Sequence, residues 1–245
     1  MAQTMPRESA AAEQLAALAS AGRFAFIVFY KANDAATQSM AQVVQQGMAA
    51  RPDRATALFV NAADPSEKGL VDRFGLARAP LPMTVAVAPN GAVTGLFRGA
   101  MNDAHIERAI VSPTMAECMK SIQAGRFVLA CVQTTRDAAV PQGVTDFKAD
   151  PEFHDRVDIV SLNAADPAEA RLLSQFQVDA KAIRAPLVAF IAPPAVLVGK
   201  FPTTATAAEL AAALHKAGKC CDDPNCKHAQ PAPQANQPNP QSRVR

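Results

Sequence analysis

The side chains best suited to metal or thiol chemistry gather near the end of the sequence. Three thiols and an imidazole occur there, at Cys220, Cys221, Cys226 and His228. Thiolates and imidazole are the ligands of structural Zn²⁺ sites, and thiolates also suit Cu(I). The intervening DDPN segment could form a turn that returns Cys226 toward Cys220 or Cys221. A metal site at these four residues is therefore one hypothesis.

Two other interpretations of the same segment stay open. Adjacent cysteines rarely both bind one tetrahedral ion, and paired C-x-x-C spacing is missing, so Cys226 could instead form a disulfide with one neighbour in an oxidising compartment. The thiols could also simply be free. The residues after His228 are rich in Pro, Gln and Asn and cannot bury apolar surface. We expect this tail, residues 219–245, to be disordered or to wrap on a partner.

The body of the chain offers little other chemistry. Cys118 lies in a helical pattern, and Cys131 lies in an apolar strand pattern. We expect Cys131 to be a small core residue, because apolar burial raises the pKa of a thiol and makes its reactive thiolate scarce. The histidines form no HExxH pattern, and the glycines form no phosphate loop. The sequence therefore predicts no catalytic residues and no required cofactor.

Composition excludes several classes of protein. The chain has 245 residues, 49% of them hydrophobic, which is enough for two cores. The formal net charge of +2 comes from interspersed charges, and aromatic residues make up 5%, so a nucleic-acid partner is not expected. No apolar run is long enough for a membrane helix, and the N-terminus lacks a signal-peptide pattern. A soluble, cytoplasmic protein is expected, or a periplasmic or secreted one if a leader was removed.

An internal repeat organises the sequence. Three markers recur in the same order at nearly the same offset: GRF at 22–24 and 125–127, NAADPSE at 61–67 against NAADPAE at 163–169, and ARAPLPMTVAVAPNG against AIRAPLVAFIAPPA. The repeat predicts a duplicated domain, with residues 1–111 as the first copy, 112–218 as the second and 219–245 as the tail.

Each copy predicts the same succession of elements. A helix (about 8–21 or 113–124) leads into a buried strand (24–30 or 127–133), and then come a helix, a second strand ending at NAADP, a further helix, a strand preceded by prolines, another strand and a closing helix. In NAADP, Asp64 and Asp166 can cap a helix whose first position is Pro65 or Pro167. The layout is α/β, with parallel strands joined by crossover helices and a final antiparallel hairpin.

This order resembles the thioredoxin-like fold, with a central mixed sheet flanked by helices in each copy. The resemblance covers residues 8–218 and rests most on the helix start at NAADP and the proline before the third strand. It implies a cis-proline beside the functional centre, and Pro82 and Pro186 match that position best. Pro80 is a rival for Pro82, because RAP at 78–80 matches RAP at 184–186.

The resemblance also implies a CxxC motif after the first long strand, and neither copy has one. The corresponding positions hold Asp34, Ala35, Ala36 and Thr37 in the first copy, and Asp137, Ala138, Ala139 and Val140 in the second. Neither set can form a disulfide. The aspartates could cap the next helix, or a carboxylate could receive a ligand or partner. The family's buried acid falls at Val28 and Cys131, so it is missing too.

Together these observations predict a non-catalytic binding or scaffold protein. The expected surface combines Asp34, Thr37 and Pro82 in the first copy with Asp137, Val140 and Pro186 in the second, because family members hold extended peptides at the cis-proline loop. The alternative is a metal-binding or thiol-exchange protein that uses the tail cysteines and His228. A binding or scaffold protein is expected to have a protein or peptide partner. The sequence does not predict the oligomeric state.

Overall fold

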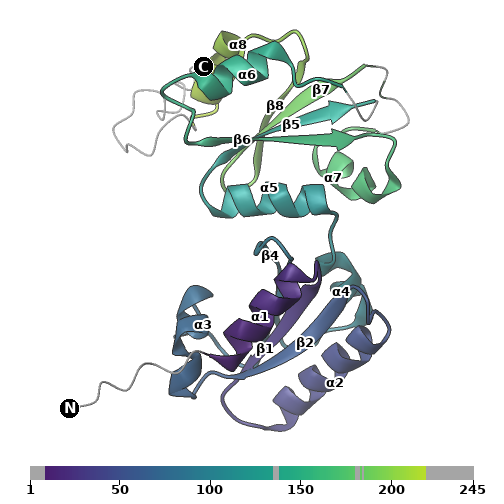
Figure 1. Cartoon of the computed structure of the whole chain (residues 1–245), viewed down its shortest axis with the longest axis vertical. Helices are drawn as coiled ribbons and strands as arrows, with labels where there is room; N and C mark the ends of the chain where they lie inside the picture. The colour runs from purple at the N-terminus through teal and green to yellow at the C-terminus, as the bar shows by residue number, and fades with distance from the viewer. Residues whose placement is uncertain (1–8, 135–137, 180–182, 184, 219–245) are drawn as a thin grey trace, which may run out of the picture. The chain divides into compact units, whose positions relative to one another are not determined.

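The computed structural model describes residues 9–134, 138–179, 183 and 185–218. The chain divides into two compact units, residues 1–124 and 125–245. Each unit contains a four-stranded sheet with helices packed on it (Figure 1). Within the described part of the chain, no helix is long and apolar enough to span a bilayer.

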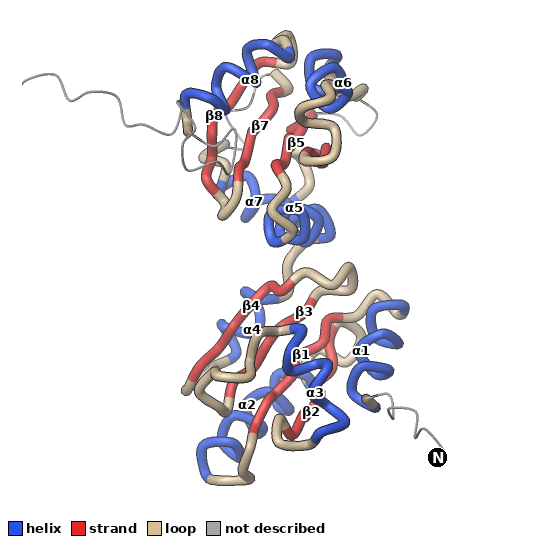
Figure 2. The backbone as a smooth tube through the Cα atoms, turned by 90° about the vertical axis from the view of Figure 1, so that its left-hand side faces the viewer, coloured by secondary structure: helices blue, strands red, loops and turns tan. Residues whose placement is uncertain are grey.

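The first unit is a mixed sheet between two layers of helices. Its elements are α1 (Ala10–Ser20), β1 (Phe24–Tyr30), α2 (Ala35–Ala49), β2 (Ala55–Asn61), η1 (Pro65–Glu67), α3 (Lys68–Arg73), β3 (Met83–Val87), β4 (Val93–Arg98), α4 (Asp103–Ala109) and α5 (Pro113–Gln123). The strand order is β2-β1-β3-β4, with β1 parallel to β2 and the other pairs antiparallel. Figure 2 shows α1 and α3 on one side of this sheet and α2 on the other.

The second unit repeats this sheet. Its elements are β5 (Phe127–Gln133), α6 (Gln142–Ala149), β6 (Val157–Asn163), η2 (Pro167–Glu169), α7 (Ala170–Gln175), β7 (Leu187–Ala192), β8 (Val196–Pro202) and α8 (Ala207–Lys216). The order β6-β5-β7-β8 and the strand directions are those of the first sheet. The predicted α/β layout is confirmed, because in each unit a parallel strand pair is followed by an antiparallel hairpin, an arrangement that resembles the thioredoxin-like fold.

Helix α5 lies with the first unit, although the repeat groups it with the second copy. The side-chain amide of Gln123 donates to the carbonyl of Val93 at 2.7 Å and accepts from its N–H at 2.9 Å. This pair satisfies one residue of the edge strand β4, which otherwise exposes unpaired backbone groups. The domain boundary after residue 111 stays a prediction from the repeat, whereas the compact units divide after α5.

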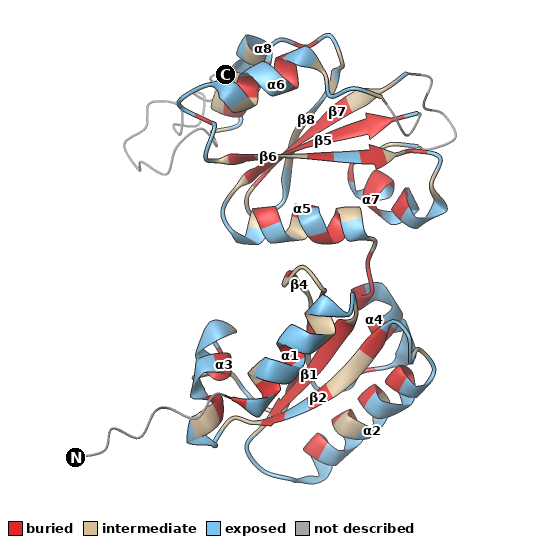
Figure 3. Cartoon of the chain, in the orientation of Figure 1, coloured by how far each residue is buried: buried red, intermediate tan, exposed pale blue. Residues whose placement is uncertain are grey.

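The central strand of each sheet is buried along its length. In β1 every residue from Phe24 to Phe29 is buried, and in β5 every residue from Phe127 to Gln133 is (Figure 3). Alternate residues of β1 face opposite layers, because side chains alternate along a strand. Ala25, Ile27 and Phe29 join the cluster formed with α1 and α3. In the second unit, Phe127, Leu129 and Cys131 join the cluster formed with α6 and α8.

The repeated GRF motif links the central strand to the loop before its parallel neighbour. Gly22 and Gly125 have φ values of 69° and 74°, a left-handed conformation that favours glycine. The following arginines turn to backbone carbonyls: Arg23 donates to Pro52 and Ala55, and Arg126 donates to Asp155 and Val157. Both copies therefore use one device to hold two parallel strands in register.

The NAADP motif forms the same hydrogen bonds in both copies. The side chain of Asn61 accepts from Ala63 N–H at 3.0 Å, and that of Asn163 accepts from Ala165 N–H at 3.0 Å. Asp64 and Asp166 accept from the N–H two residues later at 2.9 Å, so both cap the turn as predicted. The turn begins as a 3₁₀-helix, with Pro65 or Pro167 in its first position.

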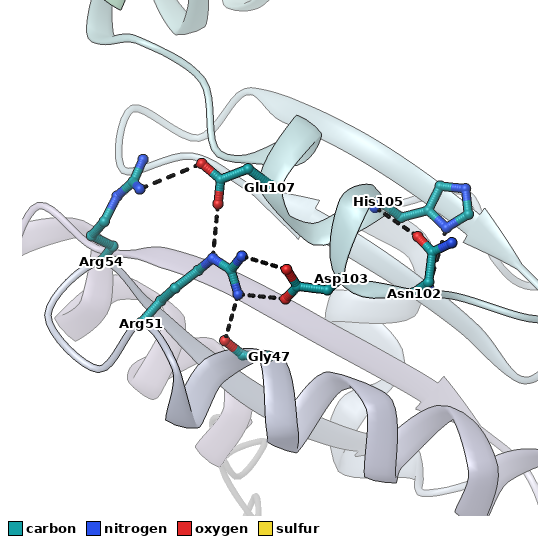
Figure 4. Close-up of polar contacts among 7 residues, drawn as sticks. All are labelled: Gly47, Arg51, Arg54, Asn102, Asp103, His105 and Glu107. Atoms are coloured by element: carbon teal, nitrogen blue, oxygen red, sulfur yellow. Dashed lines mark hydrogen bonds and ion pairs between the residues drawn. The ribbon is translucent and has the colours of Figure 1, made fainter.

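Arg51 fixes the end of α2 against α4 (Figure 4). Its guanidinium donates two hydrogen bonds to Asp103, at 2.6 and 2.8 Å, and one to Glu107 at 2.8 Å. It also reaches the carbonyl of Gly47 at 3.2 Å. Planar two-point pairing of this kind restricts orientation as well as distance. The position of α2 relative to the segment that enters α4 is therefore set by the Arg51 contacts.

Gly143 provides a test of the packing of the second unit. A Cβ at this position of α6 would lie 1.9 Å from the carbonyl oxygen of Ala205, a backbone atom that cannot rotate away. Gly143→Ala should lower the free energy of unfolding of the second unit by about 1–3 kcal/mol. The measurement is urea denaturation combined with hydrogen exchange of β5 and β7. The control is Gly69→Ala in α3, where an added Cβ meets nothing within 4 Å; equal stability of both variants would contradict the close approach.

Candidate functional site

The start of α2 lies where the resemblance places a redox centre, and it is built around a helix cap. Asp34 is the N-cap residue, and its carboxylate accepts from Thr37 N–H at 2.9 Å. The hydroxyl of Thr37 donates to the carbonyl of Ala32 at 2.8 Å, and Thr37 is buried. The predicted cap at Asp34 is confirmed. Positions 34–37 hold no thiol.

The cap interaction changes the titration of Asp34. The backbone N–H of Thr37 first, and its hydroxyl second, lower the pKa of the exposed Asp34 carboxyl below its ordinary value. Hydrogen bonds that favour the charged form of a carboxyl act in this direction. Asp34 is therefore held as a carboxylate that caps a helix, and it is not set up as a proton donor near neutral pH.

A cis bond between Leu81 and Pro82 comes before β3. This finding decides between the two candidates in the first copy, because Pro80 does not follow a cis bond among the described residues. Met83, the next residue, pairs with Phe29 of β1 and with Arg98 of β4. The loop at Pro82 is thereby anchored beside the carboxyl end of β1, which leads to α2.

A cavity of about 380 Å³ opens between this loop and α2. Its lining consists of Ala36, Ser39, Met40 and Val43 from α2, Pro80, Leu81 and Pro82 from the loop, and Arg98, Gly99, Ala100 and Met101 from the end of β4 and the segment after it. Apart from Ser39 and Arg98, the lining side chains are apolar. Of the surface residues predicted in this copy, Pro82 lines the cavity, whereas Asp34 and Thr37 do not.

Several residues of this cavity were not predicted from the sequence. The four positions from α2 follow the spacing i, i+3, i+4 and i+7, which is one face of a helix, so a periodicity signal for them was present. Arg98 and Met101 gave no such signal. They reach the cavity because β4 pairs with β3 and then ends beside the loop at Pro82.

The second unit holds a smaller cavity, of about 190 Å³, at the equivalent place. Its lining consists of Cys131, Val132, Gln133, Ala138, Ala139, Pro141, Pro186, Leu187 and Thr203. Of the surface residues predicted in this copy, Pro186 belongs to this lining, whereas Val140 does not and its side chain is exposed. Asp137 lies outside the described residues. The cis bonds of the described chain precede Pro82 and Pro194, so the expected cis bond at Pro186 is not found; spacing alone does not fix an uncommon isomer.

The helix after β5 begins later than the repeat predicts. Helix α6 starts at Gln142 with Pro141 as its N-cap residue, and no side chain caps it. The expectation that Asp137 caps this helix is therefore wrong. The reason is Pro141, which disfavours helical backbone at Val140 and has no N–H to donate within a helix. This signal was present in the sequence.

Cys131 faces the smaller cavity but is poorly suited to thiol chemistry. It is buried in the core cluster of the second unit, and it is a free thiol. Burial raises the pKa of the Cys131 thiol to about 11, so little thiolate is present at neutral pH. The prediction of a core role for Cys131 is confirmed.

The predicted metal ligands Cys220, Cys221, Cys226 and His228 lie outside the described residues, so metal binding there stays a prediction. Within the described ranges, no group of three or more His, Cys, Asp or Glu side chains could hold a metal ion.

Comparison with known proteins gives similarity to solved structures alone. No family model matches the chain, and no curated protein matches it. The first two thioredoxin domains of Eps1p from Naumovozyma dairenensis are 12% identical, with 82% of this chain and 91% of that chain covered and a TM-score of 0.32. Human ERp44 is 12% identical over 90% of this chain and 59% of its own, with a TM-score of 0.40. A domain of alkylhydroperoxide reductase AhpF from Enterococcus faecalis is 13% identical over 81% and 94%, with a TM-score of 0.31.

The cap at Asp34 predicts a specific dependence of stability on pH. Because the pKa of Asp34 is lowered in the folded state, its stabilising effect is complete above the unfolded pKa and is lost as the pH falls through the folded value. The melting temperature of the wild type should therefore fall relative to that of Asp34→Asn as the pH drops below about 4, the ordinary pKa of an aspartate, because the neutral amide caps without titrating. Circular dichroism melts over this range check the prediction. At neutral pH, Asp34→Ala should melt a few degrees below the wild type. If the difference in melting temperature between the wild type and Asp34→Asn were the same at every pH, the prediction would be wrong.

Proposed function

We propose that the chain is a non-catalytic binding or scaffold protein whose first unit holds an extended segment of a protein partner in the cavity beside Pro82. The observation that carries the proposal is this cavity, which lies next to positions 34–37 where no thiol is present. Pockets that bind small ligands have volumes of roughly 300–1,000 Å³ and are mostly apolar with a few polar groups. The cavity beside Pro82 meets both criteria.

The loop at Pro82 also offers backbone groups to a partner. Neither the N–H nor the C=O of Leu81 takes part in the backbone hydrogen bonds among the described residues. An extended segment laid along the loop could pair with both groups, as in binding modes where the main chain supplies affinity and side-chain pockets supply selectivity. The apolar lining from Met40, Val43 and Met101 would take a side chain of that segment.

The same residues argue against a redox reaction. Asp34 and Thr37 occupy the positions of the two thiols, and Thr37 is buried with its hydroxyl bonded to Ala32. Val28, where the resemblance implies a buried acid, is a core residue. A thiol–disulfide exchange needs an accessible thiolate, and neither Asp34 nor Thr37 can supply one. Binding without catalysis is what the remaining structure supports.

Peptide binding can be tested with an array of random peptides probed with the full chain. Ser39→Trp places a large side chain at the exposed mouth of the cavity, so it should abolish most binding or weaken it at least about tenfold. The matched control is Gln45→Trp, which adds the same side chain to an exposed position of α2 away from the cavity. If the wild type bound no peptide, or if Ser39→Trp bound the same peptides as the control, the proposal would be wrong.

The lack of catalysis can be tested by insulin reduction in dithiothreitol. The wild type should show no turnover above background. Asp34→Cys combined with Thr37→Cys should gain turnover, because it restores two thiols three residues apart at a helix N-terminus, where the dipole lowers a thiol pKa. Asp34→Cys alone, which adds one thiol without a partner, is the control. Wild-type turnover that survives replacement of the tail cysteines by serine would contradict the proposal.

A further inference from the structure

Arg98 places a cation at the edge of the cavity in the first unit. It is the last residue of β4 and pairs across the sheet with Met83, the residue that follows Pro82. Its side chain is exposed and also lines the cavity. The register of β3 and β4 therefore places Arg98 beside the loop that the proposed partner would contact.

Arg98 is not neutralised by the described part of its own unit. It forms no ion pair there, in contrast to Arg51, which is held by Asp103 and Glu107. A guanidinium carries five N–H donors and no acceptor, so its natural partner is a carboxylate. Those donors remain available to a ligand in the cavity.

The rest of the lining does not supply a carboxylate either. Ser39 is its other polar side chain, and no acidic residue lines the cavity. The nearest acid along α2 is Asp34, whose carboxylate is engaged by Thr37 N–H and which is not part of the lining. A basic or neutral ligand would leave the Arg98 charge without a partner, whereas an acidic one would complement it.

The second unit lacks this cation. In its sheet, Leu187 takes the place of Met83 and pairs with Pro202, so a proline stands at the position of Arg98. The lining of its smaller cavity contains no charged side chain. A preference that depends on Arg98 should therefore belong to the first unit alone.

From these observations we infer that the partner segment bound by the first unit carries an acidic side chain close to an apolar one. The inference rests on the proposed function and names the chemistry of its ligand. In an extended segment the side chains at i and i+2 point to the same face. The apolar side chain fills the space between Met40 and Met101, and a Glu or Asp two residues away meets Arg98.

The test uses three fluorescein-labelled peptides that differ at one position: Gly-Ser-Leu-Ser-Glu-Ser-Gly and the same sequence with Gln or Lys in place of Glu. Fluorescence anisotropy with the full chain gives their affinities. The Glu peptide should bind about fivefold more tightly than the Gln peptide, as for a partly exposed charge pair, and the difference should shrink with rising salt. The Lys peptide should bind most weakly.

Variants at Arg98 show whether this preference is local. Arg98→Gln should remove the difference between the Glu and Gln peptides, and Arg98→Glu should shift the preference to the Lys peptide. The matched control is Arg78→Gln, which makes the same change of charge at an exposed residue before the loop that does not line the cavity. It should leave the preference unchanged.

The outcomes separate this inference from the proposed function. If the three peptides bound equally and Ser39→Trp still abolished binding, the acidic preference would be wrong and the binding function would stand. If Arg78→Gln removed the preference for the Glu peptide as fully as Arg98→Gln does, that preference would reflect the net charge of the protein, and its assignment to Arg98 would be overturned. If the wild type bound neither these three peptides nor any peptide of the array, or if Ser39→Trp did not weaken binding, both the acidic preference and the binding function would be wrong.

Discussion

The structure depends on a central strand that is enclosed on all sides. β1 has a parallel neighbour on one edge and an antiparallel neighbour on the other, and its residues from Phe24 to Phe29 are buried. Because β1 carries no polar side chain in that range, its position is fixed by packing and by the ladders of its neighbours. The chain passes from the carboxyl end of β1 to Asp34 and α2, and Met83, which pairs with the same end of β1, holds the loop at Pro82 beside it. The cavity lies between α2 and this loop.

Much of the frame could be predicted from the sequence because the devices that build it are local. GRF and NAADP each act within a few residues of themselves or on an adjacent loop, so NAADP forms the same hydrogen bonds in both copies and each GRF arginine donates to a carbonyl at the start of the neighbouring parallel strand. The long strands were also predictable, since continuous apolar runs in a repeated order fit buried parallel strands. The start of α6 was missed because the repeat was followed in preference to Pro141, a local breaker.

The cavity could be predicted less well because it is made by residues distant in sequence. Arg98 reaches it through the pairing of β3 with β4, and the register of that pairing cannot be read from either strand alone. The contacts of Arg51 with Asp103 and Glu107 are unpredictable for the same reason, since they join two helices that are far apart in the sequence, with β2, β3 and β4 between them. The resemblance located Pro82 correctly but did not indicate which side chains would surround it.

The two units show how a shared frame can present different surfaces. In the first, α2 begins directly at Ala35, so one helical face lines a cavity of about 380 Å³. In the second, Pro141 delays the helix, and Ala138 and Ala139 lie as loop against a cavity of about 190 Å³. The carbonyl of Ala138 is tied to the Gln133 side chain at 2.6 Å, which holds this loop over the end of β5. With a proline in place of Arg98 as well, the second unit offers less room and no charge, so the case for ligand binding is stronger for the first.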